Sequence, residues 1–186
     1  MKRIIAIVIS MILLVGCSGE KNEVSKAIDL RNKLLKSNGC KFDASVSADY
    51  GDKIYSFKMN CEADNKGTLN FIVNNPDTIA GISGSISEEG GKLTFDNEIL
   101  AFEMLADGCV SPVTAPWLML YSIRGGYIRG CGYDNDRLYI QIDDSYAENG
   151  IRLELWTDEN GLPAFCELYW QQKKVVSIVV ENFIFL

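Results

Sequence analysis

Residues 40 to 61 read CKFDASVSADYGDKIYSFKMNC, and this stretch decides the fold. Apolar side chains occupy the even positions of its first half and the odd positions of its second half. An alternation with a period of two is typical of strands with one buried face, and Gly51 and Asp52 mark the turn of a hairpin. A loop with an even number of residues brings both apolar sets to the same face. The sequence therefore predicts an antiparallel sheet with one apolar side and one polar side.

Further stretches of this kind follow along the chain, separated by pairs of asparagine, proline and glycine residues that favour turns. They predict a meander of about ten strands within one domain. The expected strands are 40–50, 55–61, 68–73, 80–87, 92–104, 127–132, 137–143, 151–157, 163–170 and 174–185.

Two helices interrupt this pattern. Residues 22–38 have apolar side chains at helical spacing, at Val24, Ala27, Ile28, Leu34 and Leu35, and Gly39 follows as the residue that ends the helix. Arg31 interrupts the apolar stripe, so we expect its charged end to extend to solvent. Residues 115–124 begin with Pro116 in the first turn and end before two glycines, and they are apolar on nearly every side. This second helix must be covered on more than one side.

The first residues of the chain have the features of an export signal. Lys2 and Arg3 precede twelve mostly apolar residues, too few for a helix that crosses a bilayer, which needs about 20. The leucine, small residue and cysteine at Leu14, Gly16 and Cys17 resemble the lipobox of bacterial lipoproteins. The resemblance implies that Cys17 is diacylated, as by palmitate, and becomes the mature N-terminus. The alternative is an ordinary signal peptide that carries a cysteine.

We therefore expect a signal peptide at 1–16, a lipidated linker at 17–21 and a single domain at 22–186. The protein would lie on the extracytoplasmic face of the cell membrane, held by its lipid. The chain has a net charge of −7 and no run of basic residues, so nucleic acid is not an expected partner.

The sequence contains no histidine, which excludes Ser-His-Asp and Cys-His nucleophiles and histidine-bound zinc. Carboxylates at 134, 136, 143 and 144 and in DENG at 158–161 fall where turns are predicted. We interpret them as solvated turns, because no spacing fixes a catalytic pair or an oxygen-ligand loop. The sequence therefore predicts no enzyme activity, no metal and no cofactor.

Taken in order, these elements resemble the LolA-like fold of lipoprotein carriers and lipid-binding proteins. The segments that carry the resemblance are NNPDTIAGISGSI (74–86), GGKLTFDNEI (90–99) and NGLPAFCELYWQQKKVVSIVVENFIF (160–185). It implies an α+β fold, a curved antiparallel half-barrel whose concave face is covered by the N-terminal helix and the short central helix. The membrane-anchored branch in spore-forming Gram-positive bacteria, which includes germination lipoproteins such as GerS, resembles the chain more than the soluble carrier does. The carrier's first strand has an arginine that latches the lid, and CKFDASVSADY has none.

The leading functional hypothesis is a non-catalytic protein that holds a lipid or other apolar ligand in the concave face. The same residues could instead form a packed core, and the helix at 115–124 could be a fixed cover or a lid that opens. The alternative function, which the resemblance implies, is an envelope or spore-germination partner that positions another cell-wall protein such as an amidase. The residues predicted to bind the ligand are Phe42, Val46, Tyr55, Phe57, Met59, Trp117, Leu120 and Tyr121.

Outside the cytoplasm, cysteines tend to form disulfides. Cys40 and Cys61 lie opposite each other if Asp49 to Asp52 form a four-residue loop, and they are diagonal neighbours if the loop is residues 51 and 52 alone. Cys109 and Cys131, which flank the short helix, are a second candidate pair.

Overall fold

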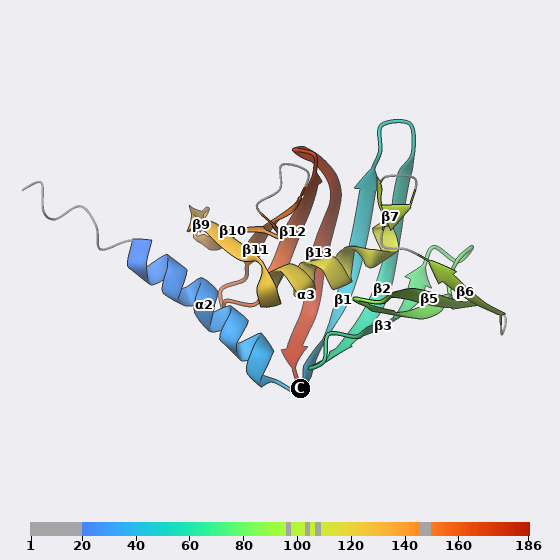
Figure 1. The fold of residues 1–186 in the computed structure, drawn as a ribbon, viewed down its shortest axis with the longest axis horizontal. Helices are drawn as coiled ribbons and strands as arrows, with labels where there is room; N and C mark the ends of the chain where they lie inside the picture. Colours follow the sequence, from blue (N-terminus) through green and yellow to red (C-terminus); the bar gives the residue numbers. More distant parts are fainter. Residues whose placement is uncertain (1–19, 96–97, 103–104, 107–108, 146–149) are drawn as a thin grey trace, which may run out of the picture.

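The computed structural model describes residues 20–95, 98–102, 105–106, 109–145 and 150–186. The described residues form an antiparallel sheet of eleven strands, a separate two-stranded sheet and two α-helices (Figure 1). This confirms the predicted α+β class. The helices are α2 (Glu20–Lys36) and α3 (Ala115–Gly125), the latter preceded by the 3₁₀ turn η1 (Pro112–Thr114). The strands are β1 (Gly39–Asp49), β2 (Ile54–Asp64), β3 (Leu69–Asn75), β4 (Ser83–Ser87), β5 (Gly90–Phe95), β6 (Glu98–Phe102), β7 (Leu105–Ala106), β8 (Cys109–Val110), β9 (Tyr127–Asp134), β10 (Arg137–Asp143), β11 (Ile151–Thr157), β12 (Pro163–Trp170) and β13 (Lys173–Phe185).

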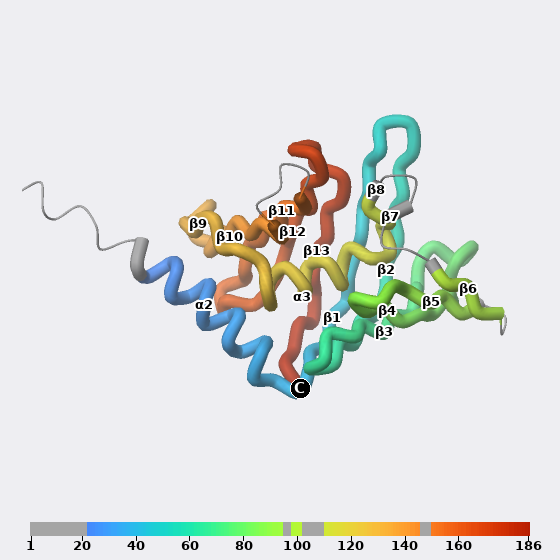
Figure 2. The backbone as a smooth tube through the Cα atoms, viewed as in Figure 1, coloured from blue at the N-terminus to red at the C-terminus, as the bar shows by residue number. Residues whose placement is uncertain are grey.

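The large sheet has the order β6-β5-β4-β3-β2-β1-β13-β12-β11-β10-β9. Every neighbour pair is a sequential antiparallel connection except β1 with β13, which joins the two ends of the chain in the middle of the sheet. The C-terminus lies beside the turn between α2 and β1 (Figure 2). There Asn38 N donates to Leu186 O and Leu186 N donates to Gly39 O, both at 2.9 Å.

The β1–β2 hairpin has the predicted alternation but not the four-residue loop from Asp49 to Asp52. Asp49 pairs with Ile54, and Tyr50 N donates to Lys53 O at 3.0 Å, so the tighter loop sets the register. Cys40 consequently faces Ala63, and Cys61 faces Phe42. The expected Cys40–Cys61 disulfide is therefore wrong, and both thiols are free. Cys131 is also free, and the prediction that it pairs with Cys109 concerns a side chain outside the described residues.

Two strand predictions need correction. The segment 92–104 was expected as one strand, but β5 and β6 are two strands that pair with each other, Leu93 opposite Leu100. The strand expected at 80–87 begins at Ser83, because residues 76–82 form a compact turn in which Gly81 N donates to Val73 O at 2.9 Å.

Helix α2 begins at Glu20, two residues before the expected start, and ends at Lys36. Its buried face is Ala27, Leu30 and Leu34, spaced i, i+3 and i+7, and it packs against β9 and α3. The predicted face was wrong in part, because Val24, Ile28 and Leu35 are exposed. The reason is that this helix lies at one end of the sheet and contacts it along a narrow line.

Helix α3 crosses the apolar side of the sheet and contacts β10, β12 and β13 (Figure 1). Every residue from Ala115 to Leu120 is buried, and so are Ser122 and Ile123. The helix expected at 115–124 is confirmed, as is its covering on more than one side. Together with the inward rows of the strands it forms one continuous hydrophobic core.

The predicted signal peptide, residues 1–16, and the lipidation site Cys17 lie outside the described residues. Within the part of the chain that the structure describes, neither helix combines the length and hydropathy required to cross a membrane.

Candidate functional site

The candidate site is a cleft beside α3 on the helix-bearing side of the sheet. Its volume is about 260 Å³, a little below the range of about 300–1,000 Å³ typical of small-molecule sites. We call it the α3 cleft. Its lining residues are Ala63, Lys66, Gly67, Leu69, Glu88, Trp117, Leu120, Tyr121, Arg124, Gly125, Gly126 and Asp144.

Trp117 and Tyr121 form the aromatic wall of the α3 cleft. One helical turn separates them, and their rings stack with centroids 4.9 Å apart and an angle of 21° between the planes. Trp117 is 4% exposed and Tyr121 is 41% exposed, so the wall runs from the core to the surface. The two rings together offer a ligand an apolar surface, and the buried Trp117 ring fixes the inner end of this surface.

The opposite wall is the turn between β2 and β3, and α3 holds it in place. Trp117 Nε1 donates to Gly67 O at 2.8 Å. Arg124 donates from Nη2 to Asp64 O at 2.8 Å and from Nη1 to Asn65 O at 3.1 Å. The Asp64 carboxylate accepts hydrogen bonds from the backbone of Lys66 and Thr68, each at 2.9 Å. Because both walls are connected by these bonds, the α3 cleft is a largely preformed site.

Charged groups stand at the rim of the α3 cleft. Lys66 and Arg124 are basic, and Glu88 and Asp144 are acidic. The Asp144 carboxylate is hydrogen-bonded to the backbone, because its Oδ1 accepts from Ile151 N at 2.9 Å. An apolar interior with a mixed polar rim fits a molecule with an apolar body and a polar end.

The structure brings together three of the eight residues predicted to bind a ligand. Trp117, Leu120 and Tyr121 line the α3 cleft. Phe42, Val46 and Met59 are between 1% and 3% exposed and belong to the hydrophobic core, and Phe42 also borders a larger hollow described below. Phe57 is half-buried against that core, and Tyr55 is exposed near Tyr50 on the β1–β2 hairpin. Apolar alternation locates the inward face but cannot distinguish a core position from a cleft position.

Sequence reasoning missed the part of the site supplied by Lys66 and Arg124. Arg124 was included only in the predicted helix range, and its role depends on backbone carbonyls about 60 residues earlier in the chain. The one available signal was an arginine in the last turn of an otherwise apolar helix.

A larger hollow of about 650 Å³ lies on the polar side of β1–β6. Polar side chains in its lining are joined by hydrogen bonds: Asn60 and Asn182 both donate to the Asp43 carboxylate, the latter at 2.7 Å. Asn74, beside the hollow, donates to Asn60. Lys41 and Glu62 pair across β1 and β2 at 3.0 Å. These polar groups are satisfied by one another, and we consequently place the apolar-ligand site in the α3 cleft despite its smaller volume.

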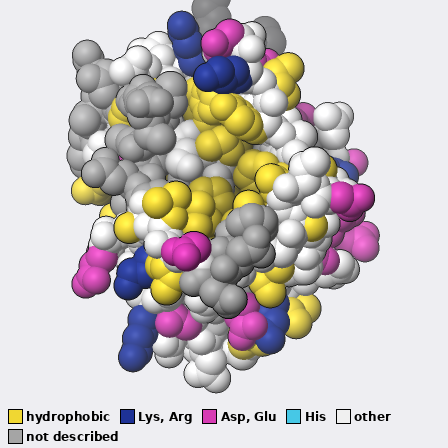
Figure 3. Space-filling view, turned by 90° about the vertical axis from the view of Figure 1, so that its right-hand side faces the viewer, with side chains coloured by type: hydrophobic (Ala, Val, Ile, Leu, Met, Phe, Trp, Pro, Cys, Tyr) yellow, Lys and Arg dark blue, Asp and Glu magenta, His cyan; other side chains and the backbone are white. Residues whose placement is uncertain are grey.

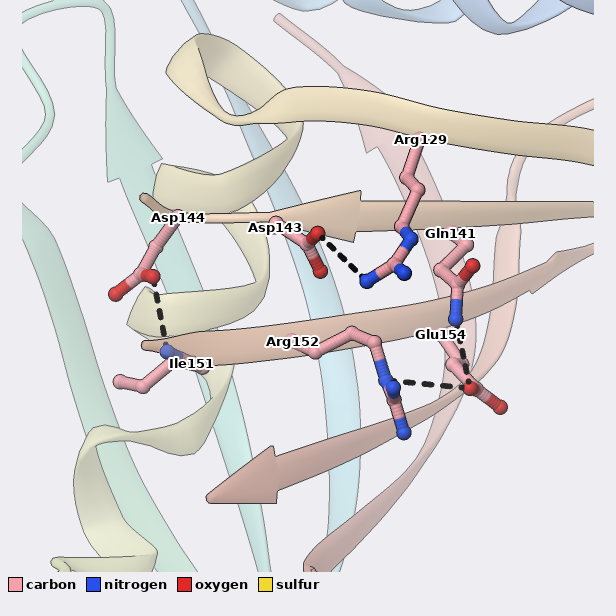
Figure 4. Close-up of polar contacts among 7 residues, drawn as sticks. All are labelled: Arg129, Gln141, Asp143, Asp144, Ile151, Arg152 and Glu154. Carbon is pink, nitrogen blue, oxygen red and sulfur yellow. Dashed lines mark hydrogen bonds and ion pairs between the residues drawn. The ribbon is translucent and has the colours of Figure 1, made fainter. Parts of the chain in front are cut away.

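Four of the carboxylates considered for catalysis have structural partners, and Figure 4 shows two of them, Asp143 and Asp144. Asp143 pairs with Arg129 at 3.3 Å, and Asp144 holds the backbone at Ile151. Asp134 accepts from Trp156 Nε1 at 2.9 Å, and Asp158 accepts from the backbone of Asn160 and Leu162. Among the described residues, no group of three or more Cys, Asp or Glu side chains is placed to hold a metal ion.

Comparison with known proteins gives similarity of fold alone. No family model matches the chain, and no curated protein does. Similar solved structures include a LolA superfamily protein from Nitrosomonas europaea, with 9% identity over 90% of this chain and 93% of that one and a TM-score of 0.44. A Vibrio parahaemolyticus domain described as an outer membrane lipoprotein-sorting protein has 10% identity over 86% and 91% and a TM-score of 0.49. The Mycobacterium tuberculosis lipoprotein LppX has 8% identity over 87% and 93% and a TM-score of 0.40. The similarity concerns the arrangement of strands and helices.

Proposed function

We propose that this protein is a non-catalytic lipoprotein, anchored through Cys17 on the extracytoplasmic face of the cell membrane, which binds an apolar ligand in the α3 cleft. The observation that carries the proposal is the convergence of Trp117, Leu120 and Tyr121 on a cleft with two fixed walls. The charged rim supports an amphiphilic ligand, such as a fatty acid or the acyl end of a lipid.

Apolar side chains also reach the molecular surface outside the α3 cleft, and Figure 3 shows several of them gathered at the centre of one face. Burying apolar surface contributes about 25 cal/mol per Å², or about 0.8 kcal/mol for each methylene. An acyl chain of which about six methylenes enter the protein would therefore gain about 5 kcal/mol before ordering costs.

The first prediction tests this site by binding. Tyr121 is partly exposed, so Tyr121→Glu is expected to fold while placing a carboxylate at the mouth of the α3 cleft. We expect it to weaken the binding of a fluorescent fatty acid at least about tenfold, which corresponds to about 1.4 kcal/mol. Ile54→Glu, at a residue 72% exposed on the β1–β2 hairpin, is the matched control and should bind like the wild type.

Extraction of the purified protein followed by mass spectrometry provides an independent measurement. A co-purified lipid that is lost in Tyr121→Glu supports the proposal. Wild-type protein that carries no lipid and binds none of a series of fatty acids, phospholipids and acylated peptides contradicts it.

A second candidate function is the binding of an envelope protein, and strand β6 favours it. This strand is an edge of the sheet, and Ile99 and Leu100 on its two sides are 71% and 64% exposed. An exposed apolar edge can pair with a strand of a partner. The more specific assignment to germination lipoproteins, with a cell-wall amidase as partner, belongs to this candidate. Ile99→Lys should abolish such pairing and leave fatty-acid binding unchanged.

A further inference from the structure

Helix α2 has an exposed apolar stripe beside its buried face. Val24, Ile28 and Leu35 are 39%, 44% and 53% exposed. At about 100° per residue they fall within about 40° of one another around the helix. A surface helix ordinarily has one apolar stripe, and here Ala27, Leu30 and Leu34 already form it. We call Val24, Ile28 and Leu35 the second stripe.

The charge of α2 is opposite to that of the protein. Its 17 residues include five basic and three acidic side chains, a net charge of +2, whereas the whole chain carries −7. Three of the basic residues, Lys26, Lys33 and Lys36, are exposed, and two of them lie in the last turn. A helix with a basic polar face and a separate apolar stripe has the composition of helices that lie in a membrane interface.

The chain also fixes how far α2 is from the proposed anchor. Only Ser18 and Gly19 separate Cys17 from Glu20, the first residue of the helix. At about 3.6 Å per residue, the three steps from Cys17 to Glu20 span at most about 11 Å. If Cys17 is acylated, as the proposed function states, the first turn of α2 stands at the bilayer surface.

We propose that α2 lies along the outer surface of the lipid bilayer, with the second stripe inserted at the boundary between headgroups and acyl chains and with Lys36, about 100° around the helix from the centre of the stripe, beside anionic headgroups. The stripe extends over about 16 Å of helix, since each residue adds about 1.5 Å, so a helix lying flat uses all of it. The tether keeps the bilayer at a high effective concentration beside the helix, which favours this occupant over a second copy or another protein.

The docked helix would orient the whole domain, because polar contacts hold α2 to the rest of the protein. Arg31 donates from Nε to Ile123 O and from Nη2 to Gly126 O, both at 2.6 Å, at the C-terminal end of α3. Lys26 Nζ donates to Tyr133 Oη at 2.5 Å and lies 5.2 Å from the centre of that ring. The α3 cleft, whose lining includes Gly126, would consequently stand at a fixed distance from the lipid surface.

The test uses the mature lipidated protein in vesicles of phosphatidylcholine and phosphatidylglycerol that contain brominated lipid. Leu35→Trp places a fluorophore in the second stripe. Ile54→Trp places one at a more exposed position, 72% against 53%, near the turn of the β1–β2 hairpin, and this end of the hairpin lies far from α2 in Figure 1. We expect quenching of the added fluorescence at residue 35, little at residue 54, and a weaker effect at residue 35 in vesicles of phosphatidylcholine alone.

The mass of the mature protein shows whether Cys17 is acylated, so it tests the proposed anchor independently of the position of α2. Acylated Cys17 with equal quenching at residues 35 and 54 overturns the inference and leaves the anchor standing. Cys17 without acyl groups overturns the anchor, and the inference with it. A third outcome also contradicts the inference: on vesicles, α2 cross-links to α2 of a second copy while the tryptophan at residue 35 is not quenched. The second stripe would then contact another protein molecule and not the bilayer. Circular dichroism of both tryptophan variants verifies that they fold.

Discussion

Tyr139 lies on the outer side of the sheet beside Trp156, with ring centroids 5.0 Å apart. Burial raises the pKa of its hydroxyl to about 12, and the nearby Glu154 carboxylate adds to the shift. The folded protein therefore favours the neutral phenol more strongly than the unfolded chain does, where the pKa is about 10. This contribution to the free energy of unfolding is complete below pH 10 and is lost as the pH rises toward 12.

We therefore predict that Tyr139→Phe flattens the alkaline side of the stability curve. Urea midpoints measured from about pH 8 to about pH 11 should fall less steeply in the variant than in the wild type. The exposed Tyr55 supplies the control variant, Tyr55→Phe, measured in the same series. Parallel curves for the wild type and Tyr139→Phe would contradict the argument.

The cysteines make a second prediction at this scale. Burial raises the pKa of the Cys40 thiol to about 12 and also raises the pKa of Cys61 and Cys166, all three of which are buried. Cys131 is only half-buried. Since the thiolate is the reactive form, iodoacetamide at about pH 8 should label Cys131 at least about tenfold faster than the other three. Peptide mapping measures the rates, and a Cys40–Cys61 cross-linked peptide would refute the register of the hairpin.

At the scale of elements, Gly84 in β4 shows how closely the neighbouring strands β3 and β5 approach the backbone of β4. A Cβ at this position would lie 2.3 Å from Lys92 O in β5 and 2.8 Å from the ring of Phe71 in β3. Neither the backbone carbonyl nor the buried ring can move freely. Gly132 in β9 is different, because a Cβ there would meet nothing within 4 Å.

Gly84→Ala is thus expected to lower the free energy of unfolding by about 1–3 kcal/mol, the usual cost of overpacking. Gly132→Ala should change it by less than about 1 kcal/mol, in either direction. Urea denaturation of both variants measures the difference. Equal values for the two would show that β4 does not approach its neighbours as closely as the structure indicates.

At the scale of the whole molecule, the pairing of β1 with β13 makes the two halves of the sheet one structure. Residues 39–49 lie beside residues 173–185, so the central strands form only when both ends of the chain are present. Ile178, opposite Val46, is completely buried at this junction. Contacts so distant in sequence favour a single cooperative transition rather than separate unfolding of each half.

Two probes test this expectation. Tryptophan fluorescence reports α3, β11 and β12, where the three tryptophans lie, whereas far-ultraviolet circular dichroism reports every strand. Their urea transitions should coincide. Ile178→Ala should move both midpoints together and cost about 2–5 kcal/mol. Two separate transitions would indicate that the halves unfold independently.

The sequence by itself determined the elements of this protein. The alternation in residues 40–61 specified a half-buried hairpin, Pro116 and Gly125 bounded the second helix, and the turn residues separated most of the strands. These properties depend on local geometry, because side-chain period and turn chemistry act over a few neighbouring residues. The resemblance of Leu14, Gly16 and Cys17 to a lipobox is likewise a local pattern, and it predicts the anchor.

Only the tertiary structure decided which residues meet. The register of β1 and β2 separated Cys40 from Cys61, and the position of α2 at one end of the sheet left Val24, Ile28 and Leu35 exposed. The α3 cleft depends on Trp117 reaching Gly67, 50 residues away, and α2 is held by Arg31 bonded to Ile123, 92 residues away. No local pattern encodes such pairs, because the two residues interact only after distant segments of the chain have packed together. The same packing determines which few apolar side chains line a cleft and which fill the core.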